Sequence, residues 1–139
     1  MNSPTPDSEP ARDFRPVLDR LGEARLHRKP GDNDGYRQLR ADAVGLIREF
    51  PEVGEAVIEF QFRNQKASEE IQLEAIWLLY ELGADPNQRG RATELLGLAE
   101  QSKLPSVRTA ARRAVNGLSR RRLADGQRRG EQPATAETG

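Results

Sequence analysis

The sequence predicts an all-α fold, a short α-solenoid of about six helices in three antiparallel pairs. Six segments have apolar residues at helical spacing and are separated by prolines, glycines and other turn-forming residues. One apolar pattern, with alanine at its second position, recurs three times along the chain. The chain has 139 residues, of which 35% are apolar, which is enough for about one compact domain.

Composition indicates where this domain begins and ends. Residues 1–10 contain three prolines among small polar residues, and residues 124–139 have only alanine as apolar content. Neither segment can bury enough apolar surface to offset an ordering cost of roughly 1–2 kcal/mol per residue. We therefore expect disordered tails at 1–10 and 124–139 and a helical repeat domain at 11–123.

Capping and turn residues delimit the first two helices. Asp13 can cap the first helix, and residues 30–35 are a run of turn formers. A second helix is predicted from about Tyr36 to Phe50, and Pro51 ends it.

The third segment is ambiguous by its periodicity. Alternate residues over 56–62 are apolar, as in a strand, whereas Val53, Val57 and Phe60 fit a helix. Because a lone strand has no partner elsewhere in this chain, we expect a helix over 51–64.

The last three helices have clear start signals. Ser68 is a good N-cap for a fourth helix, which has acidic residues in its first turn and ends at a turn over 83–86. A fifth helix is predicted over 87–101. Pro105 opens a sixth helix, which we expect to end near Leu123.

The second, fourth and sixth helices share one apolar pattern. Its positions are spaced i, i+4, i+8 and i+11, so they lie on one helix face. The second position is always alanine, whose small side chain lets a partner helix approach closely. The three sets are Leu39, Ala43, Ile47 and Phe50; Ile71, Ala75, Leu79 and Leu82; and Val107, Ala111, Val115 and Leu118. Repeats of this length with two helices per unit are typical of α-solenoids.

The stretch from Pro105 to Leu118 resembles the second helix of a HEAT repeat. Its Val107-Arg108 pair is followed by spaced alanines and a leucine, the hallmark of that helix. By this resemblance the chain is similar to the HEAT-like, armadillo-type helical repeat family over most of residues 12–122. HEAT arrays are generally scaffolds, so the resemblance implies a protein-binding role.

The other two units match the family less specifically. HEAT units often place an aspartate six residues before the arginine, and Asp34 and Arg40 fit this spacing. Gln72 replaces the arginine in the middle unit, and Ser102 stands where the aspartate before Arg108 is expected. Only the last unit therefore resembles HEAT repeats at residue level.

The fourth helix is apolar on nearly all sides, so we expect other helices to cover most of it. Trp77 and Tyr80 extend its apolar surface, and we expect them in the core between repeats. If exposed, the pair would instead anchor a partner or form a homodimer surface. Glu70, Glu74 and Glu81 are expected to mark the side that faces water.

Charge is segregated along the chain, although its 22 basic and 22 acidic residues cancel. Residues 49–85 carry 2 basic and 9 acidic side chains, and residues 103–129 carry 9 and 1. The basic segment predicts a surface that docks on an acidic protein, binds phosphates, or simply solvates the end of the array. Its candidate partner-binding residues are Arg108, Arg112, Arg113, Arg120, Arg121 and Arg122.

Catalysis and metal binding have little support in the sequence. The chain has no cysteine, and its single histidine, His27, stands beside two cations. There is no nucleophile motif, phosphate-binding loop or dinucleotide fingerprint. Carboxylates four residues apart, such as Glu55 and Glu59, are typical of a solvated helix face. We therefore expect no enzyme, no cofactor and no metal.

These observations favour a non-catalytic protein–protein interaction module that binds another protein through the surface of its second helices. The alternative is a nucleic-acid-binding protein that acts through the basic C-terminal helix and tail. No apolar run is long enough to span a membrane, and the absence of cysteine fits a reducing, cytoplasmic setting.

Overall fold

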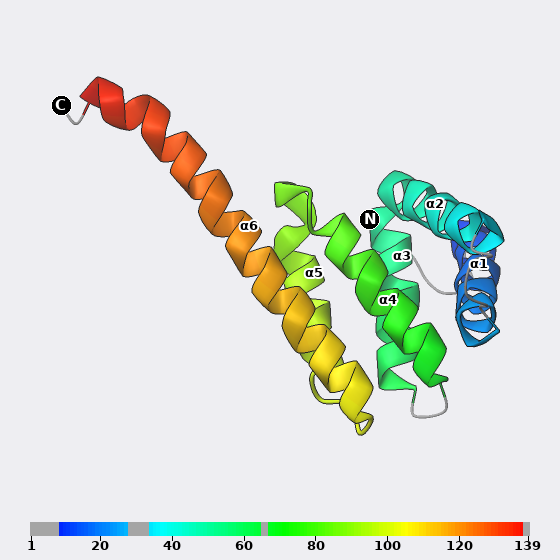
Figure 1. The fold of residues 1–139 in the computed structure, drawn as a ribbon. Coiled ribbons are helices and arrows are strands. Elements are labelled where there is room, and N and C mark those ends of the chain that lie inside the picture. The colour runs from blue at the N-terminus through cyan, green and yellow to red at the C-terminus, as the bar shows by residue number, and fades with distance from the viewer. Residues whose placement is uncertain (1–8, 28–33, 65–66, 138–139) are drawn as a thin grey trace.

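The computed structural model of the chain describes the backbone of residues 9–27, 34–64 and 67–137, with side chains at 14–27, 34–64 and 67–126. All regular structure within these residues is helical, which confirms the all-α fold class (Figure 1). The helices are α1 (Glu9–Leu26), α2 (Asp34–Glu49), α3 (Pro51–Arg63), α4 (Glu69–Leu82), α5 (Pro86–Ala99) and α6 (Pro105–Glu137).

The helices pack in two layers. Helices α1, α3 and α5 follow one another in the first layer, and α2, α4 and α6 follow one another in the second. Each helix also packs on the next one along the chain. In Figure 1, α4 and α6 run side by side in the same direction, and α5 runs in the opposite direction behind them. Within the described residues α1 and α2 contact neither α5 nor α6, so packing proceeds from one end of the molecule to the other.

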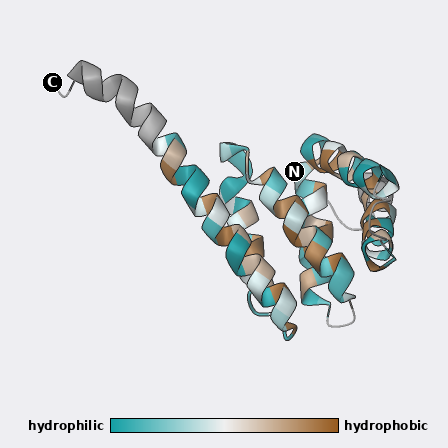
Figure 2. Cartoon of the chain, in the orientation of Figure 1, coloured by the Kyte–Doolittle hydropathy of each residue, from teal (hydrophilic) through white to brown (hydrophobic). Residues whose placement is uncertain are grey.

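Helix α4 lies at the centre of the core. It contacts each of the other five helices, as its nearly all-round apolar surface predicts. Figure 2 shows hydrophobic residues along much of α4. The largest apolar side chains buried in this core are Phe14, Leu18, Leu21, Ile47, Ile58, Leu78, Leu79, Leu95, Leu96 and Leu118. One core therefore includes residues of all six helices.

The repeated apolar pattern marks the buried face of α2, α4 and α6. Ala43, Ala75 and Ala111 are each 0% exposed, as expected for positions where helices approach closely. Phe50 is the exception, at 36% exposed, because α2 has ended before it and Pro51 turns the chain into α3.

Helix α1 packs on α4 as well as on its neighbour α2. The approach occurs at Gly22, where an added methyl group would lie 2.5 Å from Cγ1 of Ile71. Because glycine leaves this space free, the backbone of α1 can lie against the first turn of α4. Apolar periodicity did not predict this contact, since a glycine adds nothing to the pattern.

Local capping signals agree with the helix starts. The Oγ of Ser68 accepts the N–H of Ile71 at 3.1 Å and caps α4, as predicted. Helix α5 begins one residue earlier than expected. Asp85, which the sequence assigned to the preceding turn, accepts the N–H of Asn87 at 3.0 Å, and Pro86 takes the first helical position.

Residues 51–63 form α3, so the strand alternative for this segment is wrong. The alternating apolar residues lie on different sides of the helix. Ile58 is buried in the core, Phe62 is half-buried and Phe60 is 46% exposed. Helical packing therefore overrides a local pattern that also fits a strand.

Two helices extend beyond their expected ends. Helix α1 begins at Glu9, earlier than expected, and α6 continues past Leu123 to Glu137 and projects from the other helices (Figure 1). Gly126 and Gly130 cost only about 1 kcal/mol each, which does not stop a helix, and α6 also includes Pro133 near its end. The structure thus has helix over much of 124–139, which composition assigned to a disordered tail; residues 1–8 lie outside the described residues.

None of the helices in the described part of the chain, α6 included, is both long and apolar enough to cross a membrane.

Replacing Ala75 with leucine is expected to lower the free energy of unfolding by roughly 1–3 kcal/mol, because the larger side chain overpacks a fully buried position. Urea unfolding followed by far-UV circular dichroism measures the change. Ala41→Leu is the matched control, since Ala41 is exposed on α2. Equal destabilisation by both substitutions would show that Ala75 does not lie at a tight helix contact.

Candidate functional site

The carboxylate of Glu74 lies in the core between α1, α2 and α4, which corrects the expectation that it faces water. Its side chain is 0% exposed. Arg25 donates from Nη1 to Oε2 at 2.8 Å, and the Tyr36 hydroxyl donates to the same oxygen at 2.5 Å. Arg40 donates from Nε to Oε1 and from Nη2 to Oε2, both at 3.1 Å. Donors from two neighbouring helices therefore satisfy the buried carboxylate.

Arg40 is also held between two aromatic rings. Its guanidinium carbon lies 4.6 Å from the ring centroid of Tyr36 and 4.1 Å from that of Trp77. Cation–π contacts of this kind add to the ion pair with Glu74. The carboxylate bound by Arg40 is therefore that of Glu74 on α4, not that of Asp34, six residues earlier, which the HEAT resemblance associates with it.

Burial and the hydrogen bond to Glu74 raise the pKa of the Tyr36 hydroxyl. An ionised phenol would lose hydration and face a carboxylate, so the protonated form is favoured. Tyr36 therefore remains a hydrogen-bond donor to Glu74 at neutral and moderately alkaline pH.

Glu74→Ala is expected to lower the free energy of unfolding by about 2–4 kcal/mol, because two arginines lose their carboxylate in a partly buried setting. Their side chains are 33% and 25% exposed, so water offsets part of the cost. Urea unfolding measures the effect. Glu70→Ala, one turn earlier on the half-buried side of α4, is the control and should change stability by less than about 0.5 kcal/mol. A similar loss at both positions would contradict the central place of Glu74.

The sequence left open whether Trp77 and Tyr80 are buried in the core or exposed, and the structure places them between these two alternatives. Both are half-buried and pack against the core, and an arginine covers one ring face of each. Arg121 of α6 lies 4.2 Å from the ring centroid of Tyr80. Gly117 makes room for that ring, since an added methyl group would lie 2.7 Å from its Cε1. The half-buried side of α4 therefore lies between α2 and α6.

Arg108 and Arg112, two of the predicted partner-binding residues, have contacts within the chain. Arg108 donates from Nη1 to the carbonyl oxygen of Ser102 at 2.8 Å, in the turn before α6. Arg112 is exposed, and its Nε lies 3.9 Å from a carboxylate oxygen of Glu100. The structure therefore gives Arg108 a structural contact in the turn and leaves Arg112 in a loose ion pair.

The remaining predicted arginines are on the surface of α6. Arg113 and Arg120 are seven residues apart, so they lie on the same side of the helix, next to Gly117 and Arg121 where α6 contacts Tyr80. Of the six predicted arginines, Arg113, Arg120 and Arg122 are exposed and pair with no carboxylate among the described residues. We call the surface made by Leu73, Trp77 and Tyr80 of α4 and Arg113, Arg120 and Arg121 of α6 the second-helix face.

Gln72 and Arg108 occupy the same position in the repeated pattern and make the same kind of contact. Gln72 donates from Nε2 to the carbonyl oxygen of Ala67 at 3.1 Å, in the turn before α4. Arg108 does the same for Ser102 in the turn before α6. Each side chain thus donates a hydrogen bond to a backbone carbonyl group in the turn that precedes its helix.

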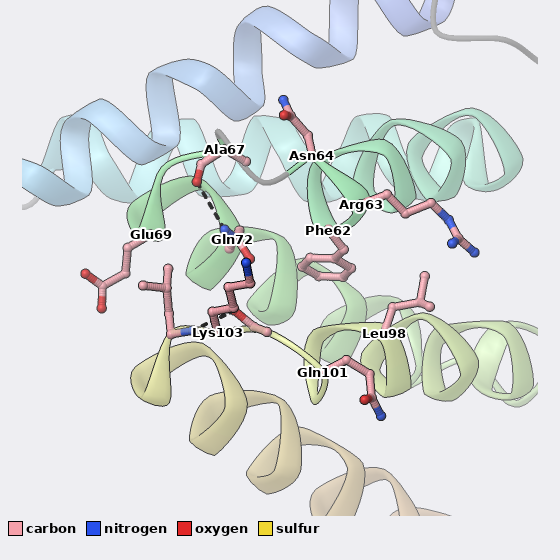
Figure 3. A pocket seen from close by; sticks show the side chains of 11 residues that line it. Phe62, Arg63, Asn64, Ala67, Glu69, Gln72, Leu98, Gln101 and Lys103 are labelled. Atoms are coloured by element: carbon pink, nitrogen blue, oxygen red, sulfur yellow. Dashed lines mark hydrogen bonds between the residues drawn. The ribbon is translucent and has the colours of Figure 1, made fainter.

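A pocket of about 550 Å³ opens where these two turns meet (Figure 3). It lies among the ends of α3 and α5 and the starts of α4 and α6, and we call it the inter-turn pocket. Figure 3 shows Phe62 and Leu98 on one side of it and Gln72 and Lys103 on the other. No sequence motif pointed to this pocket, because its lining comes from four helix ends and two turns.

Glu55 is a second buried carboxyl group, close to α5. It is 6% exposed, and its Oε2 has no hydrogen-bond partner among the described residues. Burial raises the pKa of Glu55; the charge of Arg91 opposes this rise, and Glu52 and Glu94 add to it. Arg91 instead donates hydrogen bonds to Glu94 at 2.6 Å and to Glu59 at 2.8 Å.

Glu55→Gln is expected to stabilise the protein near pH 7 and to change its stability little near pH 4. A raised pKa means that the folded state binds the proton more tightly than the unfolded chain. The stabilisation that protonated Glu55 supplies is therefore complete at low pH and is lost as the pH rises through the raised pKa. Glutamine does not titrate and avoids this loss. Urea unfolding at both pH values, with Glu23→Gln, exposed on α1, as control, measures the change. A gain in stability that is equal at the two pH values would contradict the effect of burial.

None of the protein families, curated proteins or solved structures compared with this chain matches it. Among the described residues, no three His, Cys, Asp or Glu side chains are grouped so that they could hold a metal ion. The features of this chain from which a function can be inferred are therefore its helix packing and the surfaces that this packing creates.

Proposed function

We propose that this protein is a non-catalytic, HEAT-like interaction module that binds another protein through the second-helix face. The observation that carries the proposal is the position of Arg113 and Arg120, exposed and unpaired within the described residues, beside the half-buried apolar side of α4. Arginine and aromatic side chains are enriched in protein interfaces. A cation without an internal partner can pair with an acidic group without first breaking a contact.

Three features of the packing support a HEAT-like solenoid of three helix pairs. Helices two apart in sequence are in contact in both layers. The alanine of the repeated pattern is fully buried in each of the three second helices. Gln72 and Arg108 cap equivalent turns. The close contact of α1 with α4 departs from simple pairing and places the first pair more tightly against the second.

The chemistry of the second-helix face favours a protein segment with acidic residues beside an apolar one. The arginines of α6 would pair with the acidic residues, and Leu73 with the two half-buried aromatic rings would contact the apolar residue. Arg40 is not available to a partner, because Glu74 and two aromatic rings hold its guanidinium group. Glu70 and Glu81, half-buried on the same helix, would repel a continuous phosphate backbone, whereas a protein segment can place its apolar residue beside α4 and its acidic residues beside the arginines of α6.

Nucleic-acid binding along α6 is the second candidate. The exposed arginines Arg113, Arg120 and Arg122 favour it, since basic side chains on a projecting helix can neutralise phosphates. However, residues 103–129 contain no aromatic residue on which an unpaired base could stack. We therefore rank it below a protein partner.

Site-specific photo-crosslinking tests the proposal. A photoreactive amino acid at Asn116, exposed between Arg113 and Arg120, should form adducts with one defined protein in nuclease-treated cell extract. The same probe at Asp19, exposed on α1, is the control and should not form that adduct. Adding Arg113→Gln and Arg120→Gln should reduce the adduct about tenfold, because two charged contacts are lost. An adduct with a second copy of the chain would identify a homodimer instead, and the absence of a position-specific adduct would contradict the proposal.

Titration with labelled nucleic acids distinguishes nucleic-acid binding along α6 from binding of a protein partner. If the partner is a protein, duplex and single-stranded DNA and RNA should not bind at micromolar protein in about 50 mM salt. Binding that weakens steeply with salt, with a smaller slope in the Arg113→Gln and Arg120→Gln variant, would favour nucleic acid.

A further inference from the structure

One wall of the inter-turn pocket is apolar, and hydrogen bonds hold other parts of its lining in place. Phe62 and Leu98 form one side, and Leu104 adds a third apolar residue from the turn before α6. Gln72 is 7% exposed and tied to its turn, and the Oγ of Ser102 accepts the N–H of Leu104 at 3.1 Å. The side chain and turn that shape the pocket are therefore ordered before any ligand arrives, which lowers the entropic cost of binding.

The charges around the pocket leave one cation unpaired. Lys103 is exposed and pairs with no carboxylate among the described residues, and Figure 3 shows its side chain extending toward Gln72. Arg63 instead binds Glu59 at 2.9 Å and points away from the centre of the pocket. Glu69, the acidic residue of the lining, accepts a hydrogen bond from the Ser106 hydroxyl and also points away in Figure 3. Among the described charged residues of the lining, Lys103 is thus the one that extends toward Gln72, whereas Glu69 keeps its charge but points away.

We propose that the inter-turn pocket binds a carboxylate carried next to an apolar group. The carboxylate would pair with the Lys103 ammonium, and the second N–H of the Gln72 amide offers a further polar contact. The apolar group would lie against Phe62 and Leu98.

A phosphate suits the pocket less well than a carboxylate. Phosphate recognition usually draws on several donors, often from arginine forks, whereas the described residues of this lining include one ammonium without an ion-pair partner. The chemistry fits two sources equally: a free organic acid, or the C-terminal residue of a peptide with an apolar side chain. The site lies at the turns, apart from the second-helix face, so it does not depend on the function proposed above.

Titration of the full chain with N-acetyl-phenylalanine tests the proposal. Two-dimensional ¹⁵N–¹H NMR spectra should show saturable shifts of the Gln72, Lys103 and Leu104 amides, with a Kd of about 1 mM, as expected for a ligand of this size. The neutral N-acetyl-phenylalaninamide should bind about tenfold more weakly, because it lacks the charged contact. An apolar-tailed peptide with a free C-terminus that binds more tightly than the small acid would identify a chain end as the source, and equal affinity would identify a free acid.

Substitutions at and outside the inter-turn pocket test whether the acid binds there. Lys103→Gln should bring the affinity for the acid down to that for the amide, whereas Lys103→Arg, which keeps the charge, should restore most of it. Arg112→Gln, which removes an exposed cation on α6 outside the lining, should leave the affinity unchanged. Because Lys103 and Arg112 are exposed, none of these variants should lose its fold. No saturable shift up to about 10 mM, equal affinity for acid and amide, or unchanged binding to Lys103→Gln would overturn the proposal.

Discussion

The packing of α1 and α2 on α4 depends on the hydrogen bonds and ion pairs of the buried Glu74 carboxylate. A charge removed from water must be paired, and the donors to Glu74 come from α1 and α2, far from α4 in the sequence. Those helices can satisfy the carboxylate only in one position relative to α4. Arg40 extends the constraint, because it is fixed between Tyr36 and Trp77 as well as by the ion pair. The ion pair thus specifies how an otherwise apolar interface is aligned.

Helix α4 creates the surfaces on which function is proposed. It is too apolar to face water on any broad side, so each of the other helices covers part of it. The side left between α2 and α6 is only half covered, and arginines from those helices lie over Trp77 and Tyr80. Arg113 and Arg120 border this side and remain exposed. The inter-turn pocket arises at the other end of the same packing, where the turns before α4 and α6 meet around Gln72.

The features that the sequence predicts correctly arise from interactions between residues close together in the chain. The cap at Ser68 and the proline at the start of α6 act within one helical turn, so their residues suffice to predict them. The alanines of the repeated pattern were also predicted to be buried, since one helix face is read from spacing alone. The end of α6 was missed, because composition describes what a segment can bury and not how far an existing helix continues.

The amino-acid sequence by itself determined that the chain is helical, where most of its helices start, and which face of α2, α4 and α6 is buried. Only the tertiary structure decided that Glu74 is a buried ion-pair centre, while Glu70 and Glu81 on the same helix are only half-buried. All three are acidic residues on one apolar helix, and nothing in their spacing singles one out. The difference comes from Arg25 and Arg40, which reach Glu74 only after α1 and α2 have packed on α4. Periodicity reports which face of a helix is covered, whereas the partner of a buried charge is set by contacts between residues distant in the chain.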